Sequence, residues 1–500
     1  MRTNLSADRV ALRTGVIDIG SNSIRLVVFE SLNRAPIVVF NEKVLARLGY
    51  GLKQGGTLDE ESVACALKAL QRFSAISKEL KVGTLIAVAT AAVREAADGA
   101  NFVHRVQELC GIKVSILEGK EEARLSALGV MSGIPNAEGT FGDLGGSSLE
   151  LAQLNKRTAK NHVTLPLGPF RLDEMATSKV MTKAFIQKEL HSLAWLGALR
   201  GYPFYAVGGA WRAVAKTHMA HVKHPLRVVH QYTVPWRDMD PFLDLLARVT
   251  PSSLGKLGVI SPRRIDTLSQ AAAVLHEIGC RIQPSHIVFS AFGLREGCLY
   301  DLLPEAERAR DPLIESCIAY GERVARFPGH FQLRDTWLND LLTEAPTEIR
   351  RLARAAVAVS DLAWEDQPDY RAEEVLHRVL ALPIAAIDHP GRVFLAMALF
   401  VRYGGDSLTK PLNELLRLLS EDGQWWARIT GYALRLSYSF AAGAGESLAR
   451  SRLRVRDSTL VMTISAGDRL LVGEETRRRI EKLATFLRLE PKIEIEESNS

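Results

Sequence analysis

Two short segments of this chain follow the same plan, Asp-x-Gly-x-x-Ser. The first runs from Asp18 to Ser23 and the second from Asp143 to Ser148, and each lies between two apolar runs typical of β-strands. One such turn alone is most often an ordinary β-hairpin whose small residues satisfy the turn geometry. Two matched copies instead indicate an internal duplication in which equivalent turns serve one site.

Strands and helices alternate along both copies, which favours an α/β architecture. In the first copy we expect two strands within 14–30 and others at 37–48, 84–90 and 113–117, with helices at 59–80, 100–109 and 120–131. In the second copy we expect strands at 139–144, 149–154, 202–207 and 286–291, with helices at 181–195, from 209, and at 237–248, 265–279 and 294–303. The second copy therefore repeats the first in outline.

The remainder of the chain differs in kind. Residues 305 to about 445 read almost entirely as amphipathic helix rich in Leu, Ala and Arg. The runs 453–464 and 468–475 predict a hairpin before a final helix, and 489–500 predict a frayed end. With a boundary near Pro304–Pro312, we expect three domains, at 1–135, 136–304 and 305–500.

Composition excludes several classes of protein. The five cysteines are scattered and form no CxxC pair, which argues against a disulfide framework and a structural zinc site and fits a reducing cytosol. No stretch approaches the roughly 20 uninterrupted apolar residues of a membrane span, and the first residues lack the apolar core of a signal peptide. We therefore expect a soluble, cytoplasmic protein without a membrane partner.

The charge is unevenly distributed. Residues 301–500 carry 27 Lys and Arg against 31 Asp and Glu, whereas residues 1–300 carry 36 against 26. A basic front portion attracts phosphate-rich ligands through its long-range field, although a generic solubilising charge explains the same numbers.

The repeated turns suit phosphate binding. Hairpin turns expose consecutive backbone N–H groups, small residues allow phosphate to approach them, and serine hydroxyls add donors. The residues expected to bind substrate in these turns are Ser21, Asn22, Ser23, Gly145, Gly146, Ser147 and Ser148. Asp18 and Asp143 could hold a divalent cation directly or through water.

With six further motifs, the chain resembles the exopolyphosphatase/guanosine pentaphosphate phosphohydrolase family, whose fold is that of actin and hexokinase. The motifs are ATAAVRE (89–95), ILEGKEEARLSALGV (116–130), LPLGPFRL (165–172), YAVGGAWRA (205–213), SPRRIDTL (261–268) and FSAFGLREGCLY (289–300). The resemblance covers about residues 14–302. It implies a duplicated, actin-like (ribonuclease H-like) α/β front with two domains, followed by the mainly helical C-terminal domain.

The resemblance assigns the catalytic base to Glu122 and places Arg94 against phosphate. Phosphoryl transfer needs a positioned water and charge neutralisation, and a carboxylate at the start of a helix can orient that water. Glu121 is the adjacent alternative, but successive helical residues point about 100° apart, so only one should face the cleft. Arg25, just beyond the first turn, shares the side of Ser21 and Ser23 by strand alternation and is a further substrate-binding candidate.

Mg²⁺ or another divalent cation is the expected cofactor. Asp143 and Glu150 flank the second turn and could hold it with waters, and Asp18 could join from the first turn, although Mg²⁺ usually takes only one or two carboxylates. Gly208 and Gly209 begin a helix whose N-terminal amides are a natural anion site. Trp211 beside them is more typical of a core residue than of a base-stacking one.

Two features depart from the family. The second turn of the family usually reads DxGGGS, whereas this chain has Ser147 at the third glycine. If that position needs a positive φ, serine destabilises the turn by about 1 kcal/mol. Alternatively, the serine hydroxyl could contact phosphate. The C-terminal domain resembles HD metal phosphohydrolases but lacks a His-Asp dipeptide, and His330, Asp361, His377 and the reversed Asp388-His389 are the nearest features. We therefore expect this domain to be catalytically silent and to serve binding or dimerisation.

The resemblance implies an exopolyphosphatase that removes terminal phosphate from inorganic polyphosphate with the aid of Mg²⁺. One alternative is a guanosine pentaphosphate 5′-phosphohydrolase of the stringent response; another is a degenerate regulator that binds polyphosphate or nucleotide. An ATP-dependent sugar kinase is disfavoured by the EGKEEAR and FGLREG segments. Expected partners are inorganic polyphosphate, guanosine penta- or tetraphosphate or adenine nucleotides, and a second copy in a homodimer, but not DNA.

Overall fold

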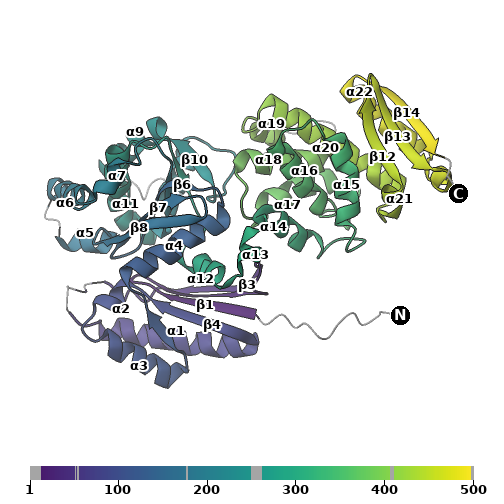
Figure 1. Cartoon of the computed structure of the whole chain (residues 1–500). Coiled ribbons are helices and arrows are strands. Elements are labelled where there is room, and N and C mark those ends of the chain that lie inside the picture. Colours follow the sequence, from purple (N-terminus) through teal and green to yellow (C-terminus); the bar gives the residue numbers. More distant parts are fainter. Residues whose placement is uncertain are drawn as a thin grey trace. The chain divides into compact units, whose positions relative to one another are not determined.

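The structure, a computed structural model, describes residues 13–50, 52, 56–175, 178–248, 262–405 and 410–496. It consists of two compact units, Met1–Arg310 and Asp311–Ser500 (Figure 1). Among the described residues, no helix combines the length and apolar character needed to cross a membrane.

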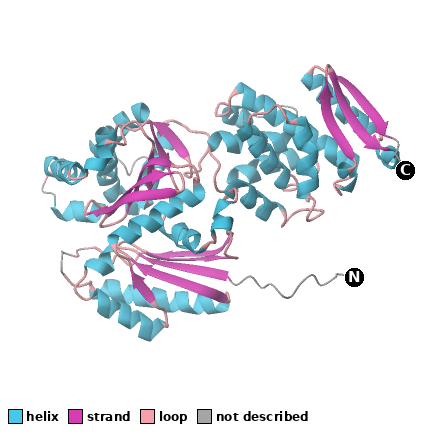
Figure 2. Ribbon diagram, in the orientation of Figure 1, coloured by secondary structure: helices cyan, strands magenta, loops and turns pink. Residues whose placement is uncertain are grey.

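Unit 1 contains two sheets, which are drawn in magenta in Figure 2. The five-stranded sheet has the order β3-β2-β1-β4-β5. Its strands are β1 (Arg13–Ile19), β2 (Ile24–Phe29), β3 (Val38–Val44), β4 (Val82–Ala89) and β5 (Val114–Ile116). The six-stranded sheet has the order β10-β11-β9-β6-β7-β8. Its strands are β6 (Glu138–Leu144), β7 (Leu149–Asn155), β8 (Thr158–Leu165), β9 (Phe204–Val207), β10 (Tyr232–Pro235) and β11 (His286–Phe289).

The two sheets share one topology. In each, three consecutive antiparallel strands are followed by two that run parallel to the first: β1 pairs with β4 and β4 with β5, while β6 pairs with β9 and β9 with β11. The six-stranded sheet adds only β10 at its edge. The internal duplication expected from the repeated turns is therefore a duplication of the whole lobe, and the predicted duplicated α/β fold is confirmed.

Helices cover both faces of these sheets. The helices of unit 1 are α1 (Glu60–Glu79), α2 (Ala91–Glu95), α3 (Gly99–Cys110), α4 (Gly119–Gly133), α5 (Pro169–Met175), α6 (Lys179–His191), α7 (Ala194–Gly197), α8 (Gly209–His221), α9 (Trp236–Arg248), α11 (Pro262–Ile282), α12 (Leu294–Leu302) and α13 (Glu305–Ala309). Helices α1 and α3 pack on the outer face of the first sheet, and α6, α8, α9 and α11 pack on that of the second.

Helices α4 and α12 lie between the two sheets and pack against each other (Figure 1). Leu125 of α4 and Leu294 of α12 join the core that covers the inner face of the first sheet, and Val130 of α4 joins the core against the second sheet. Because α4 is wedged between both lobes, its first turn is held at the place where the lobes meet.

Helix α13 belongs to unit 1, which ends at Arg310. This division lies within the segment Pro304–Pro312, where we placed the boundary of the C-terminal domain. Arg308 anchors this segment by donating hydrogen bonds to the carbonyl oxygens of Leu303 (2.8 Å) and Asp301 (2.5 Å).

In its described residues, unit 2 is mainly helical up to residue 449 and ends in a small sheet. Its helices are α14 (Pro312–Gly321), α15 (Phe331–Leu341), α16 (Thr347–Ala358), α17 (Arg371–Ala381), α18 (His389–Arg402), α19 (Lys410–Leu416), α20 (Glu421–Ala441), α21 (Glu446–Ala449) and α22 (Glu474–Leu487). The sheet has the order β12-β13-β14, with strands β12 (Ser451–Arg456), β13 (Thr459–Ser465) and β14 (Glu490–Glu496).

Two predictions for the tail were wrong. The run 468–475 is not a strand but the 3₁₀ helix η1 (Ala466–Leu471) and the start of α22, while the hairpin forms between β12 and β13. The supposedly frayed end contains β14, which pairs in parallel with β13. The alternating arginines of β12 face acidic partners, since Arg452 and Arg454 lie 3.8 and 3.4 Å from Asp340 and Arg456 lies 3.2 Å from Glu494.

The residues nearest to an HD pattern have other roles in unit 2. Asp388 caps α18 by accepting a hydrogen bond from the amide of Gly391 (2.8 Å). Asp361 is only 4% exposed and lies 3.4 Å from Arg326 and 3.7 Å from Arg402. Two guanidinium groups therefore lie beside this carboxylate, which is one of the features nearest to an HD metal set.

Candidate active site

The two repeated turns are closed in the same way. The amide of Gly20 donates to the carbonyl oxygen of Ser23 (3.1 Å), and the amide of Gly145 donates to that of Ser148 (2.9 Å). In the strand pairs that lead into the turns, Asp18 lies opposite Arg25, and Asp143 lies opposite Glu150. Arg25 and Glu150 therefore occupy equivalent positions in the two lobes, one basic and the other acidic.

The turns approach each other closely. A Cβ atom added to Gly146 would lie 3.1 Å from the Cβ of Ser21 and 3.1 Å from the ring of Phe170. The segment after β8 supports the second turn, because the amide of Phe170 donates to the carbonyl oxygen of Gly146 (2.9 Å). The structure thus brings together the predicted phosphate-binding residues of both lobes, with a small residue required at the point of contact.

Ser147 does not adopt a positive φ, and neither does Gly145 or Gly146. Of the two readings of the departure from DxGGGS, the strained one is therefore wrong, because the backbone here is open to any L-residue. The Ser147 hydroxyl lies in the contact region of the turns, 2.8 Å from where a Cβ on Gly49 would be.

Glu122 and Glu121 point to different surroundings, as expected from their helical positions in α4. Glu122 is 7% exposed, and its Oε2 accepts a hydrogen bond from Nη1 of Arg94 at 2.7 Å. Glu121 has 42% of its side chain exposed and forms an ion pair with Arg124 at 2.8 Å, which also contacts Asp301. The structure therefore favours Glu122 over Glu121 as the buried carboxylate of the site.

Arg94 is held from two sides. Besides Glu122, its Nη1 donates to the carbonyl oxygen of Leu117 at 2.7 Å, and its side chain is 16% exposed. Arg94 does not pair with its sequence neighbours Glu95 and Asp98. Glu95 pairs instead with Arg171 (2.7 Å), and Asp98 accepts from the amide of Leu58 (2.9 Å).

Four carboxylates influence one another's ionisation here. Burial raises the pKa of Glu122 to about 7, against the hydrogen bond from Arg94, and the charges of Asp143 and Asp18 raise it further. Burial also raises the pKa of Glu150 well above its usual range, with Glu122 and Asp143 adding to the effect. The pKa of Asp143 rises to about 6 and that of Asp18 also rises, in both cases mainly through burial.

The cluster joins a base candidate on α4 to acidic groups from both turns. Ser126, also on α4, donates a hydrogen bond to Oδ2 of Asp143 at 3.0 Å. Shifted pKa values of this kind concentrate at functional sites, because burying several carboxylates together is unfavourable unless a ligand or a reaction uses them.

Three arginines complete the site, and the sequence had identified only one of them. Burial lowers the pKa of Arg25 to about 10, and the nearby charges of Arg295 and Arg212 lower it further. The charge of Arg295 also acts on Asp18 and Asp143. Nε of Arg295 is buried without a hydrogen-bond partner among the described residues, which leaves a donor available to an anion.

Both missed arginines had signals in the sequence. Arg295 lies in the FGLREG segment, to which we gave no role. Arg212 lies on α8, which follows the fourth strand of the second lobe just as α2, with Arg94, follows the fourth strand of the first. Applying the duplication to the arginine as well as to the turns would have found it.

Asp18, Asp143 and Glu150 are the residues that could hold a divalent cation here. Oε1 of Glu150 is buried without a hydrogen-bond partner among the described residues, so one hard oxygen is unused. Asp18, Asp143 and Glu150 do not form a group whose oxygens all lie within 4.8 Å of one another in the described part of the chain. One or two of them, rather than all three, would therefore hold the ion directly.

Comparison with protein families gives the decisive match. The Ppx/GppA phosphatase family matches residues 27–306, more than half of the chain, and the family described as "Exopolyphosphatase, C-terminal" matches residues 338–490. This chain belongs to the Ppx/GppA phosphatase family.

The relatives of this chain share only a low sequence identity with it. Retrograde regulation protein 2 of Saccharomyces cerevisiae is 26% identical over 83% of this chain and 79% of its own length. Exopolyphosphatase 1 of Mycobacterium leprae is 26% identical over 63% of this chain and 97% of its own. A guanosine-5′-triphosphate,3′-diphosphate pyrophosphatase of Aliivibrio fischeri is 29% identical over 27% of each chain.

A solved structure shows the same fold. The exopolyphosphatase of Cytophaga hutchinsonii superposes with a TM-score of 0.53 at 24% identity, covering 58% of this chain and 97% of that one. The match corresponds in extent to unit 1, so the actin-like α/β fold of the front portion is confirmed.

The remaining Ppx/GppA motif residues are placed as follows. Gly208 caps α8 with φ +106°, and a Cβ there would lie 2.4 Å from the carbonyl oxygen of Leu144, so only glycine fits between helix and second turn. Gly209 begins the helix. Trp211 is fully buried and donates to the carbonyl oxygen of Ala271 (2.9 Å), as expected of a core residue. The SPRRIDTL motif begins at Ser261, outside the described residues.

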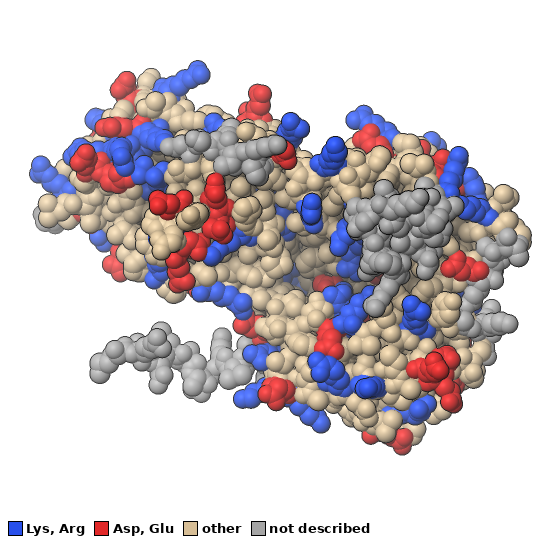
Figure 3. Space-filling model, turned by 180° about the vertical axis from the view of Figure 1, so that it is seen from behind, with Lys and Arg blue, Asp and Glu red and all other residues tan. Residues whose placement is uncertain are grey.

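The surface of unit 1 is hollowed between its two lobes, and Lys and Arg side chains gather around the hollow (Figure 3). Because arginines 25, 94, 212 and 295 act on the carboxylates between the turns, positive charge surrounds the acidic cluster. Such an arrangement attracts an anion while leaving carboxylates inside to handle water or a cation.

Proposed function

We propose that the chain is an exopolyphosphatase, which hydrolyses the terminal phosphoanhydride of inorganic polyphosphate. The observation that carries this proposal is the buried Glu122–Arg94 pair beside two matched phosphate-binding turns. A general base is most effective when its pKa lies near the working pH, and the pKa of Glu122 is raised to about 7. Membership of a phosphatase family supports the same chemistry.

In the proposed reaction, the turn amides and the hydroxyls of Ser21 and Ser148 bind consecutive phosphates of the chain end. Glu122 accepts a proton from a water molecule and orients its oxygen in line with the terminal phosphorus. Arg94 fixes that carboxylate through Nη1 and offsets charge developing on the phosphoryl oxygens. The P–O bond to the shortened chain breaks, and orthophosphate leaves.

Mg²⁺, held by one or two of Asp18, Asp143 and Glu150, would neutralise phosphate oxygens when bound. The excess of basic residues in the front portion favours a long polyanion, since a polymer presents many charges to the same field. The mycobacterial relative and the solved neighbour are both named as exopolyphosphatases, which supports the same substrate.

Substrate preference is the point to test first. Phosphate release with Mg²⁺ should be compared for long-chain polyphosphate, short-chain polyphosphate and guanosine pentaphosphate. We expect kcat/KM to be highest for the long chains. Cleavage of the guanosine nucleotide alone would replace the proposal with a 5′-phosphohydrolase, a reaction that fits the name of the Aliivibrio relative.

A regulator without turnover is the second candidate. One relative, which matches 83% of this chain, carries the name of a regulatory protein. That reading expects polyphosphate to bind tightly with no release of phosphate under any of the three conditions. The Glu122–Arg94 pair argues for turnover, because a buried carboxylate whose pKa is raised to about 7 can accept a proton from water.

A further inference from the structure

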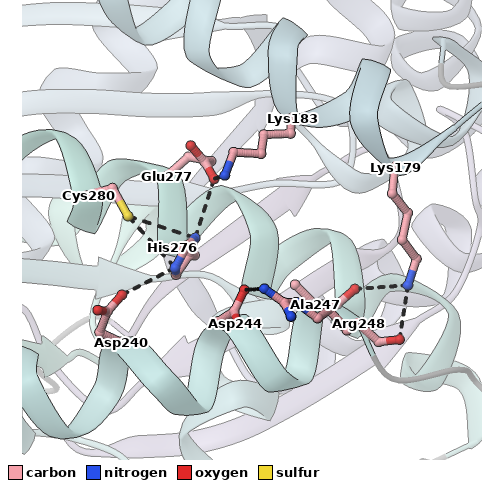
Figure 4. A network of polar contacts seen from close by, with 9 residues as sticks. All are labelled: Lys179, Lys183, Asp240, Asp244, Ala247, Arg248, His276, Glu277 and Cys280. Atoms are coloured by element: carbon pink, nitrogen blue, oxygen red, sulfur yellow. Dashed lines mark hydrogen bonds and ion pairs between the residues drawn. The ribbon is translucent and has the colours of Figure 1, made fainter.

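A second set of chemically active side chains lies in the second lobe, on helices α9 and α11 (Figure 4). Asp240 comes from α9, and His276 and Cys280 come from α11. Each offers one ligand atom, and these atoms all lie within 4.8 Å of one another, which is true of no other group of three such residues in the described part of the chain.

The helices dictate this arrangement. Residues four apart in a helix share one face, so His276 and Cys280 stand one above the other on α11. Helix α9 packs against that face and presents Asp240 to it. Oδ1 of Asp240 lies 3.2 Å from Nε2 of His276, and Sγ of Cys280 lies 3.7 Å from the same nitrogen.

The other ring nitrogen of His276 has its own acidic neighbour. Nδ1 lies 3.3 Å from Oε1 of Glu277, which is buried and anchored by Gln187 (2.8 Å) and Lys183 (3.3 Å). A carboxylate behind a histidine fixes the tautomer and leaves the opposite nitrogen, here Nε2, free to coordinate a metal.

The distances suit a tetrahedral ion. Bond lengths of about 2.0 Å to oxygen, 2.05 Å to nitrogen and 2.3 Å to sulfur place tetrahedral ligands roughly 3.3 Å (N to O) and 3.6 Å (N to S) apart. The observed separation of 3.2 Å between Oδ1 and Nε2 fits this geometry, and the sulfur lies 3.7 Å from Nε2, within reach of it. Oδ1 of Asp240 is buried yet makes no well-formed hydrogen bond with the ring, so the two atoms converge without bonding each other.

The thiol needs one adjustment. Because Sγ is also 3.9 Å from Nδ1, it lies beside the imidazole rather than in front of Nε2. Cys280 is exposed, so rotation about its side chain can bring the sulfur forward. Its exposure also leaves a fourth coordination position open to water.

We propose that Asp240, His276 and Cys280 form a binding site for a thiophilic divalent cation, Zn²⁺ in preference to Mg²⁺. The bound cation would link α9 to α11. Thiolate and imidazole ligands select zinc over magnesium, which prefers oxygen ligands. The site shares no residue with the phosphate-binding turns or with Glu122, so it is independent of the proposed hydrolysis. The absence of a CxxC pair, from which we argued against structural zinc, does not bear on a His-x-x-x-Cys helix face.

A protonated imidazole is the competing occupant. Contacts with Cys280 and Glu277 raise the pKa of His276 to about 10, so the ring can be held as a cation by the same groups. A metal ion must displace this proton before it can bind His276. The two states can be distinguished at Cys280, because its sulfur becomes a ligand only when a metal is bound.

The test is a Co²⁺ titration of the full-length, reduced, metal-free protein, followed by its absorption spectrum. Thiolate coordination gives an ultraviolet charge-transfer band that imidazole and carboxylate ligands do not. We expect one equivalent to bind with this band, and Zn²⁺ but not Mg²⁺ to bleach it. Cys280→Ala should abolish the band, whereas Cys65→Ala, at the other exposed cysteine, should leave it intact.

A second variant tests the histidine. Glu277→Gln should weaken Co²⁺ binding about 10- to 100-fold by removing the carboxylate behind His276. Absence of the charge-transfer band in the wild-type protein, or its loss in Cys65→Ala rather than Cys280→Ala, would overturn the proposal. Because neither spectrum involves polyphosphate, its failure leaves the proposed hydrolysis untouched.

Discussion

Replacing Glu122 by glutamine should abolish turnover while making the folded protein more stable at alkaline pH. The amide still accepts the hydrogen bond from Arg94 but cannot take a proton from water, so kcat should fall about 10²- to 10⁴-fold. The stability gain follows from the pKa of Glu122, which burial raises from 4.5 to about 7.

The sign of that gain depends on pH. Below pH 4.5 the carboxyl is protonated in both states, and the two proteins should be equally stable. Between pH 4.5 and 7 the unfolded wild-type chain ionises before the folded one, so wild-type stability falls. Above pH 7 the loss is complete, and at 1.36 kcal/mol per pKa unit it amounts to at most about 3.4 kcal/mol. The pKa of Glu150 is also raised, in part by the charge of Glu122, so the two carboxyl groups share this effect. We therefore expect a measured gain of about 1–3 kcal/mol.

The assay combines urea unfolding at pH 4.5 and pH 8 without divalent cations and phosphate release from polyphosphate with Mg²⁺. Glu121→Gln is the matched control, because that neighbour is exposed and paired with Arg124; it should change kcat less than tenfold and stability by less than about 1 kcal/mol. An active Glu122→Gln enzyme would refute the assignment of the base. An inactive but destabilised variant at pH 8 would show that Glu122 serves the fold instead.

Three further variants test the surroundings of the site and the second unit. Arg94→Lys keeps a charge but loses Nη1, the single nitrogen that donates to both Glu122 and the Leu117 carbonyl, so kcat should fall about 10²- to 10³-fold in steady-state assays. Gly208→Ala should lower the free energy of unfolding by about 1–3 kcal/mol, because the Cβ meets the Leu144 carbonyl; Gly201→Ala, also at positive φ but in open space, should cost about 1 kcal/mol or less. Asp361→Asn should destabilise unit 2 by about 3–5 kcal/mol, because it leaves two arginines without a carboxylate. Urea unfolding measures this effect, and Glu475→Gln, which removes an exposed ion pair, is the control. Equal effects of the two variants would contradict this account.

The central strands and the duplication were predictable from the sequence, because buried strands carry strong local patterns. Strand β6, with its apolar residues and the turn that follows, repeats β1 closely enough to be recognised without a structure. Strands β8 and β10 were missed. Both lie at sheet edges, where one side of the strand faces solvent and polar residues such as Lys160 and Asn161 obscure the pattern.

The end of the chain was misread for a related reason. The segment that forms β14 is rich in glutamate and resembles a disordered tail, yet its pairing with β13 is a long-range contact that local composition cannot reveal. The same limit applies to Arg295, whose relation to Asp18 and Asp143 depends on α12 packing between the sheets. By contrast, the choice between Glu121 and Glu122 needed only helix geometry together with the family resemblance.

The most direct test of the proposed hydrolysis is to incubate the protein with long-chain polyphosphate and Mg²⁺ in oxygen-18-labelled water. The isotope content of the released orthophosphate is then measured by mass spectrometry. Attack by a water held at Glu122 predicts that each orthophosphate carries one solvent oxygen and that the polymer shortens one unit at a time. Tight polyphosphate binding without any labelled phosphate would contradict the account and establish the chain as a sensor that keeps the family's fold.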